Sequence, residues 1–173
     1  SAESLFLYDE LYFCMSNAKT LAVFDKRDFY RQMLIRWNNW EFQVIKVIDV
    51  RSGQQHGSAE YIDIAGRMGA VHSSAFAQML SEATDAIFNA KIKSGCKAFT
   101  NQDDTLIFHD SIEDAENRNG EFVRINQEMG LRFNESKCQF SHVATWGGYD
   151  IDVLNKRIRV RKKRFVNMVD DIM

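Results

Sequence analysis

The stretch that decides the fold is residues 99–108, FTNQDDTLIF, in which two adjacent aspartates separate two short apolar runs. Runs of this kind predict paired strands, and Asp103 and Asp104 then fall at the tight turn between them. Neighbouring strand residues point to opposite faces, so the pair does not form one simple acidic patch. At a turn, however, one or both carboxylates can reach a metal ion that a third carboxylate also holds, because Mg²⁺ prefers oxygen ligands. An acidic turn without a metal is the alternative, since Asp is common in turns.

A third carboxylate that could complete such a metal site follows another predicted strand. Residues 21–24, LAVF, are typical of a buried strand, and Asp25 follows them directly. Asp25 is therefore the first candidate for the missing ligand, and an ordinary strand-terminal aspartate is the alternative.

Composition limits the possible classes of protein. A chain of 173 residues with 45% hydrophobic and 27% charged residues fits one domain with a sizeable core. No apolar run reaches about 18 residues, which predicts no membrane span. Three scattered cysteines and a first segment without a basic region predict an intracellular protein with free thiols. The net charge of −2 does not favour nucleic-acid binding, but residues 156–164 hold seven Lys or Arg, which form either a phosphate-binding cluster or a solvated basic face.

The order of predicted elements indicates an α+β fold. Helices are predicted over residues 4–16, over about 20 residues capped by Ser73 and Ser74, and from a Ser111 cap to about Met129, where Gly130 ends the helix. In the second helix, the apolar stripe that includes Phe76, Met79, Ile87 and Phe88 is assigned to the core. A hairpin is predicted over about residues 42–64 with a polar turn at 51–58, and further strands over 131–140, 145–152 and 157–160.

Five stretches together resemble the palm and part of the fingers of a reverse transcriptase, most closely those of long-terminal-repeat (gypsy-like) retrotransposons and retroviruses. In chain order they are residues 24–32 (FDKRDFYRQ), 68–78 (MGAVHSSAFAQ), 101–104 (NQDD), 130–140 (GLRFNESKCQF) and 146–150 (WGGYD). The resemblance covers roughly residues 5–160. It implies a palm-type antiparallel sheet with helices packed on one face, in a single domain over residues 1–173. The hairpin at 42–64 would be fingers-like, and a thumb or connection would begin at about residue 161.

The resemblance implies roles for individual residues. Asp25, Asp103 and Asp104 would hold two Mg²⁺ or Mn²⁺ ions, with Asp103 the firmer ligand and Asp104 mainly setting the local field. Asn101 departs from the family, which carries an aromatic residue two positions before the first aspartate of this pair.

Further roles concern the nucleotide and the primer. Tyr30 falls at the position that excludes a ribose 2′-hydroxyl, Gly69 lies in the loop under the incoming nucleotide, and Lys137 lies near the triphosphate. A core tyrosine, a plain loop glycine and a surface lysine are the respective alternatives. Residues 146–148, which are Trp146, Gly147 and Gly148, resemble the hairpin that grips the primer end.

The implied function is DNA synthesis directed by an RNA or DNA template-primer, with deoxynucleoside triphosphates as substrates. Only 24 residues precede Asp25, and the family's basic fingers segment lies upstream of this aspartate. The chain is therefore expected to work within a larger polymerase or polyprotein. Two alternatives remain, a retroelement-derived non-catalytic domain that binds a host protein or nucleic acid, and the palm of an RNA-dependent RNA polymerase.

Overall fold

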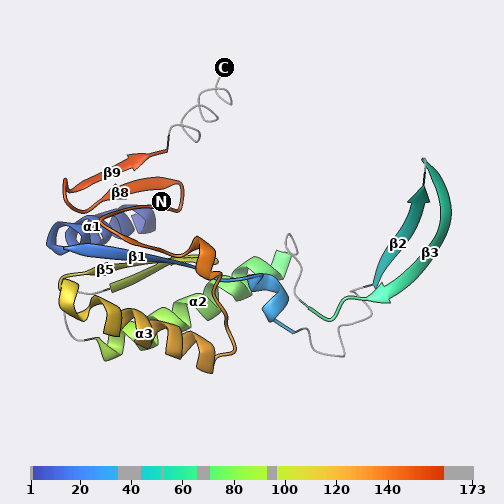
Figure 1. Cartoon of the computed structure of the whole chain (residues 1–173), viewed down its shortest axis with the longest axis horizontal. Coiled ribbons are helices and arrows are strands. Elements are labelled where there is room, and N and C mark those ends of the chain that lie inside the picture. The colour runs from blue at the N-terminus through green and yellow to red at the C-terminus, as the bar shows by residue number, and fades with distance from the viewer. Residues whose placement is uncertain (1, 35–43, 52, 66–70, 93–96, 162–173) are drawn as a thin grey trace, which may run out of the picture. The chain divides into compact units, whose positions relative to one another are not determined.

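A computed structural model describes residues 2–34, 44–51, 53–65, 71–92 and 97–161, and shows a mixed α+β chain (Figure 1). The chain divides into two compact units. We call the first, Ser1–Arg27 with Ala77–Met173, the sheet unit, and the second, Asp28–Phe76, the hairpin unit. None of the helices within the described ranges is long and apolar enough to cross a membrane.

The centre of the sheet unit is a four-stranded antiparallel sheet in the order β4-β5-β1-β6. Its strands are β1 (Thr20–Asp25), β4 (Lys97–Asn101), β5 (Asp104–His109) and β6 (Gln139–Ser141). The register pairs β1 with β5 over the whole length of both strands, from Thr20 opposite His109 to Asp25 opposite Asp104. The apolar runs around β1 and the aspartate pair therefore form neighbouring strands.

Both faces of this sheet are covered, because alternate residues of its strands enter two different cores. One core joins Ala22 and Phe24 of β1 to Phe88 of α2 (Val71–Lys91) and to Phe122 of α3 (Ile112–Glu128). The other core joins Leu21 of β1 to α1 (Ala2–Asn17) and to a three-stranded sheet. The strands of that smaller sheet are β7 (Val143–Trp146), β8 (Tyr149–Asp152) and β9 (Arg157–Val160). The expectation of helices on one face thus holds for α2 and α3 but is wrong for α1.

The hairpin unit contains the short helix η1 (Phe29–Gln32) and two paired strands, β2 (Val44–Arg51) and β3 (Gln54–Ile62). A hairpin over about residues 42–64 was predicted, and the two strands confirm it. The polar turn predicted over residues 51–58 is too long, because β3 already begins at Gln54. Gly53, with φ of 78°, permits the tight reversal that makes this short loop possible.

Helix α2 differs from its prediction at its start and in its buried face. It begins at Val71, so Ser73 and Ser74 lie within the helix and do not cap it. Phe76, Met79 and Ile87 are exposed, and only Phe88 of the named stripe is fully buried. The buried face instead includes polar residues, namely Ser81, Thr84 and Asp85.

The third helix follows its prediction closely. The Ser111 hydroxyl accepts a hydrogen bond from the Asp114 N–H at 3.2 Å, and Gly130 has a φ of 78° just beyond the helix. The strand predicted over residues 131–140 is not continuous, because η3 (Glu135–Lys137) separates β6 from an isolated antiparallel bridge between Phe133 and Lys26. The strand predicted over 145–152 is divided by a turn at Gly147 and Gly148, which have φ values of 56° and 83°.

Candidate metal centre

Three carboxylates meet at one end of the central sheet. Asp25 and Asp104 are the last directly opposed residues of β1 and β5, so their side chains project from the same face. Asp103 is the second of the two residues that connect β4 to β5. One carboxylate oxygen from each of the three lies within 4.8 Å of the others. The turn therefore brings both members of the aspartate pair to the end of β1.

The turn that presents Asp103 is held by hydrogen bonds from three directions. The Lys26 N–H donates to the Asp103 carbonyl at 2.9 Å, and Trp146 Nε1 donates to the Asp104 carbonyl at 3.0 Å. From α2, the Ser81 hydroxyl donates to the Gln102 carbonyl at 2.8 Å. Gln102 has φ of 55°, a left-handed conformation that costs a non-glycine residue roughly 1–2 kcal/mol. These bonds offset that cost and fix the position of the carboxylates.

Lys137 reaches the same site from a segment that is distant in the sequence. The Asn134 N–H donates to the Asp25 carbonyl at 2.8 Å, and the Arg27 N–H donates to the Arg132 carbonyl at 2.9 Å. This pairing brings η3 beside the end of β1, where Lys137 Nζ lies 3.6 Å from Asp25 Oδ2. The lysine side chain is 64% exposed and that of Asp25 is 16% exposed, so the ammonium approaches the carboxylates from the solvent side.

A cleft of about 330 Å³ adjoins these groups, and its lining includes Asp25, Asp104, Ser136, Lys137, Gln139 and Thr145. The cleft thus combines two of the three clustered carboxylates, one cation and several neutral hydrogen-bonding side chains.

The carboxylates repel one another when all of them are ionised. Burial, and then the negative charges of Asp103 and Asp25, raise the pKa of Asp104 to about 6. Asp104 also shares a hydrogen bond with Asp25, which raises its pKa further by favouring the protonated form. A divalent cation would relieve this repulsion, and three carboxylates are the hard oxygen donors that Mg²⁺ and Mn²⁺ prefer. The donor set therefore fits such an ion.

Sequence reasoning missed a buried lysine directly behind the turn. Lys26 is only 2% exposed, and its Nζ donates to Thr105 Oγ1 at 3.2 Å. Burial lowers the pKa of Lys26 to about 8, although the charges of Asp85, Asp103 and Asp104 act in the opposite direction. Burial likewise raises the pKa of Asp85, on α2, to about 6. The available signal was the alternation along β1, which puts position 26 on the same face as the buried Phe24.

Of the residues expected to contact a nucleotide, only Lys137 belongs to the sheet unit. Tyr30 lies in η1 of the hairpin unit, where it is half-buried and its ring centroid is 6.1 Å from that of Phe29. Gly69 lies outside the described residues, as do residues 162–173 of the expected thumb or connection.

The residues expected to grip a primer do lie beside the turn. Trp146 donates to the Asp104 carbonyl, as described above, and Gly147 and Gly148 form the reversal between β7 and β8. A Cβ atom added to Gly147 would lie 3.5 Å from Asn101 Nδ2. The β7–β8 turn and the β4–β5 turn are therefore in close contact, and Asn101 lies at that contact.

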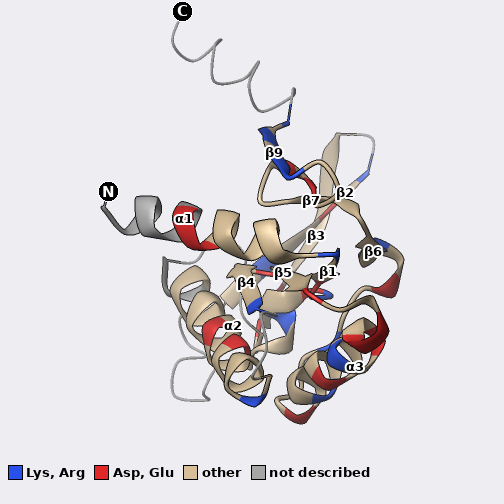
Figure 2. Cartoon of the chain, turned by 90° about the vertical axis from the view of Figure 1, so that its left-hand side faces the viewer, with Lys and Arg blue, Asp and Glu red and all other residues tan. Residues whose placement is uncertain are grey.

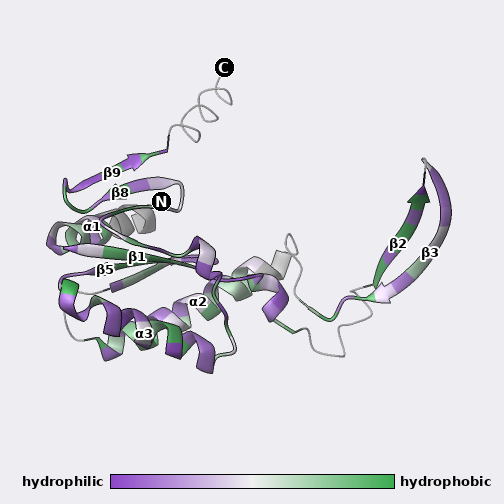
Figure 3. Cartoon of the chain, viewed as in Figure 1, coloured by the Kyte–Doolittle hydropathy of each residue, from purple (hydrophilic) through white to green (hydrophobic). Residues whose placement is uncertain are grey.

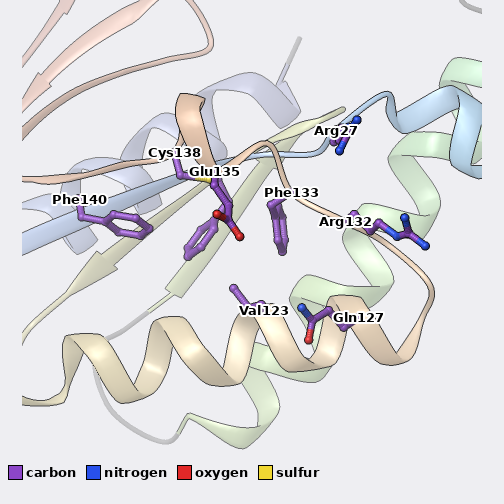
Figure 4. Close-up of a pocket in the computed structure, with 9 residues that line it drawn as sticks. Arg27, Val123, Gln127, Arg132, Phe133, Glu135, Cys138 and Phe140 are labelled. Atoms are coloured by element: carbon purple, nitrogen blue, oxygen red, sulfur yellow. The ribbon is translucent and has the colours of Figure 1, made fainter.

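A second hollow, of about 370 Å³, lies between α3 and residues 131–140 (Figure 4). Its lining includes three aromatic rings, and those of Phe133 and Phe140 lie 5.2 and 5.5 Å from the ring of Phe24, centroid to centroid. Arg27 and Arg132 lie at one end of it in Figure 4. It contains none of the predicted site residues.

The basic segment near the end of the described chain is partly balanced by acids. Figure 2 shows the positive residues of β9, where Arg157 and Arg159 are directly opposite Asp152 and Asp150 of β8. Lys156 is engaged elsewhere, because its Nζ donates to the Met15 and Ala18 carbonyls at the end of α1. The described part of this segment is thus not a uniformly basic surface.

No protein-family model matches the chain, and neither does any curated protein sequence.

Proposed function

We propose that the sheet unit is a reverse-transcriptase-like palm that carries out template-directed DNA synthesis within a larger polymerase or polyprotein. The observation that carries this proposal is the meeting of Asp25, Asp103 and Asp104 within 4.8 Å at the end of two paired strands, with Lys137 3.6 Å from Asp25. An antiparallel sheet that presents carboxylates from a strand end and an adjacent turn is the arrangement that such a palm requires. The order of the five resembling stretches supports the same assignment.

In this function the three aspartates would hold two Mg²⁺ or Mn²⁺ ions. When bound, such ions supply the Lewis acidity that activates a primer 3′-hydroxyl and neutralises the charge of the departing pyrophosphate. Asp25 and Asp104, which project from one face, hold their oxygens together without further movement of the chain.

The protein's own contribution is positioning and electrostatics, because nucleotidyl transfer needs little covalent chemistry from side chains. Lys137 lies at the solvent side of the cleft, where its ammonium can donate to the phosphates of a nucleotide and to the leaving pyrophosphate. The β7–β8 turn, which Trp146 ties to the Asp104 carbonyl, is the proposed contact for the primer end. Tyr30 is assigned to the selection of deoxynucleotides through the resemblance.

A second candidate function is protein binding without catalysis, and one observation favours it. Val44, Val47, Val50, Tyr61 and Ile62 of the β2–β3 hairpin are all about half exposed, and Figure 3 shows β2 as largely hydrophobic. Exposed apolar side chains gathered in one element are typical of a contact with another protein. Such a partner would be another segment of a polyprotein or a host protein.

Primer extension tests the proposal directly. The chain is incubated with a primed RNA template, deoxynucleotides and Mg²⁺ or Mn²⁺, beside an Asp103→Asn variant and a Glu113→Gln variant that removes an exposed acid from α3. Extension by the parent and by Glu113→Gln, but not by Asp103→Asn, is the expected result. Extension with ribonucleotides alone would favour the RNA polymerase alternative.

A measurement of Mn²⁺ binding distinguishes the outcomes in which the chain extends no primer. If the chain extends no primer but binds Mn²⁺ in a manner that Asp103→Asn abolishes, it is a palm that needs other segments. If it neither extends a primer nor binds Mn²⁺, the polymerase assignment is wrong and the binding function takes its place.

A further inference from the structure

A buried polar network lies behind the carboxylate turn, on the sheet face that α2 and α3 cover. Lys26 Nζ donates to Thr105 Oγ1 at 3.2 Å, and the hydroxyls of Thr105 and Thr100 are hydrogen-bonded to each other at 2.7 Å. The Thr100 hydroxyl in turn donates to the Asp85 carboxylate. The network therefore runs from a lysine at the end of β1, through a cross-strand pair of threonines, to an aspartate on α2.

This network contains two opposite charges that are almost completely removed from water. Lys26 is 2% exposed and Asp85 is 7% exposed. Asp85 Oδ1 is buried and has no hydrogen-bond partner among the described residues, so the ammonium of Lys26 is the charge that compensates it. A buried Asp85 carboxylate without the Lys26 ammonium would cost several kcal/mol, whereas Lys26 also interacts with the charges of Asp103 and Asp104.

The network is also linked to the metal centre through the backbone. The Lys26 N–H holds the Asp103 carbonyl at 2.9 Å, and Lys26 follows Asp25 directly in the chain. The charged groups that act on the Lys26 ammonium include Asp85, Asp103 and Asp104. Because the Lys26 side chain is almost completely buried, salt screens these interactions only weakly.

We propose that Lys26 and Asp85 are positioning residues that set the affinity of the carboxylate cluster for divalent cations from the opposite face of the sheet. The inference rests on the metal centre of the proposed function. Lys26 compensates the three carboxylates when no cation is present and opposes an incoming cation. Asp85 balances Lys26 and so reduces that opposition.

The two residues therefore have distinguishable effects on metal affinity. Asp85→Asn leaves the ammonium without its acid, so Mn²⁺ binding should weaken about three- to tenfold. The double variant Lys26→Met with Asp85→Asn removes both charges, and its Mn²⁺ affinity should return to that of the parent or exceed it. Lys26→Met alone is unsuitable, because it leaves a buried carboxylate without its ammonium.

The experiment is a calorimetric titration of the full chain with Mn²⁺, run on the parent, Asp85→Asn, the double variant and Asp85→Glu. Asp85→Glu keeps the charge and should bind Mn²⁺ as the parent does, which provides a test even if the double variant fails to fold. Glu113→Gln controls for the loss of a distant acid, and circular dichroism verifies folding.

Weaker binding by Asp85→Asn with recovery in the double variant would establish the inference. Binding that is unchanged in Asp85→Asn, or that is weakened equally in Asp85→Asn and Asp85→Glu, would overturn it. A folded double variant that binds more weakly than Asp85→Asn would show that the network serves only as structural support. If the parent binds no Mn²⁺, or if Asp103→Asn binds it as well as the parent does, the metal centre of the proposed function itself fails.

Discussion

Replacing Asp104 by asparagine should stabilise the protein when no divalent cation is present. Burial and the charges of Asp103 and Asp25 raise the pKa of Asp104 to about 6, from an ordinary value of 3.8. Because folding raises this pKa, the folded state holds its proton more tightly than the unfolded state does. The resulting stabilisation is complete below pH 3.8 and is lost as the pH rises through 6. At neutral pH the folded protein therefore carries a disfavoured charge, which asparagine removes.

The expected gain follows from the size of the pKa change. A rise from 3.8 to about 6 is about two units, and at 1.36 kcal/mol per unit it corresponds to roughly 3 kcal/mol for a fully buried group. Asp104 is only partly buried, so solvent screening reduces the figure to about 1–2 kcal/mol at pH 7. With a urea dependence near 2 kcal/mol per molar, the unfolding midpoint should rise by roughly 0.5–1 M. Near pH 4 the difference should vanish.

Urea unfolding followed by circular dichroism, in EDTA at pH 4 and pH 7, measures this effect. Asp152→Asn is the matched control, because hydrogen bonds from Asn155 hold the pKa of Asp152 below its ordinary value, and its replacement should not stabilise the protein. Added Mn²⁺ at about 100 times its Kd should stabilise the parent by about 2.7 kcal/mol and the variant by less. An Asp104→Asn protein that is less stable than the parent at pH 7 in EDTA, or equally stabilised at both pH values, would refute the reasoning.

Three further predictions concern single residues. Lys137→Gln should slow primer extension about 100-fold. The urea midpoint should not change, because the Lys137 side chain is mostly exposed. An unchanged extension rate would show that Lys137 takes no part in the reaction. Gly147→Ala should lower the free energy of unfolding by about 1 kcal/mol, because alanine disfavours φ of 56°. Gly57→Ala, with no atom within 4 Å of the added Cβ, is the control and should lower it by less. Equal effects of the two substitutions would contradict the role of the turn. Ser111→Ala should lower the free energy of unfolding in urea by about 1 kcal/mol, because it removes the N-cap of α3. An unaltered urea midpoint would show that the cap does not contribute to stability.

The sequence predicted the elements whose signals are local. The apolar run ending in Asp25 and the two runs around Asp103 form strands because each run is short, apolar and bounded by polar residues. The cap at Ser111 and the stop at Gly130 follow from side-chain and backbone preferences that act within a few residues.

The contacts behind the turn were not predictable in the same way. Met79 and Ile87 have the spacing of a core stripe, yet they are exposed, because α2 turns Ser81 and Asp85 toward Gln102 and Thr100, at the end of β4 and the β4–β5 turn. Only the pairing of β1 with β5 shows that Lys26 and Thr105 share this space. Long-range pairing thus overrode helical periodicity, and residue patterns within one segment do not contain that information.

The order of the strands also has a consequence for the synthesis of the protein. Strand β1 lies between β5 and β6, and about 80 residues separate the end of β1 from the start of β5. At roughly 5–20 residues per second, a ribosome needs about 4–16 s to produce the partner of β1 after β1 itself. During that interval the apolar side chains of residues 21–24 have neither strand neighbour. The nascent chain is therefore exposed to aggregation at β1, and a chaperone that binds extended apolar segments should increase the yield of folded protein.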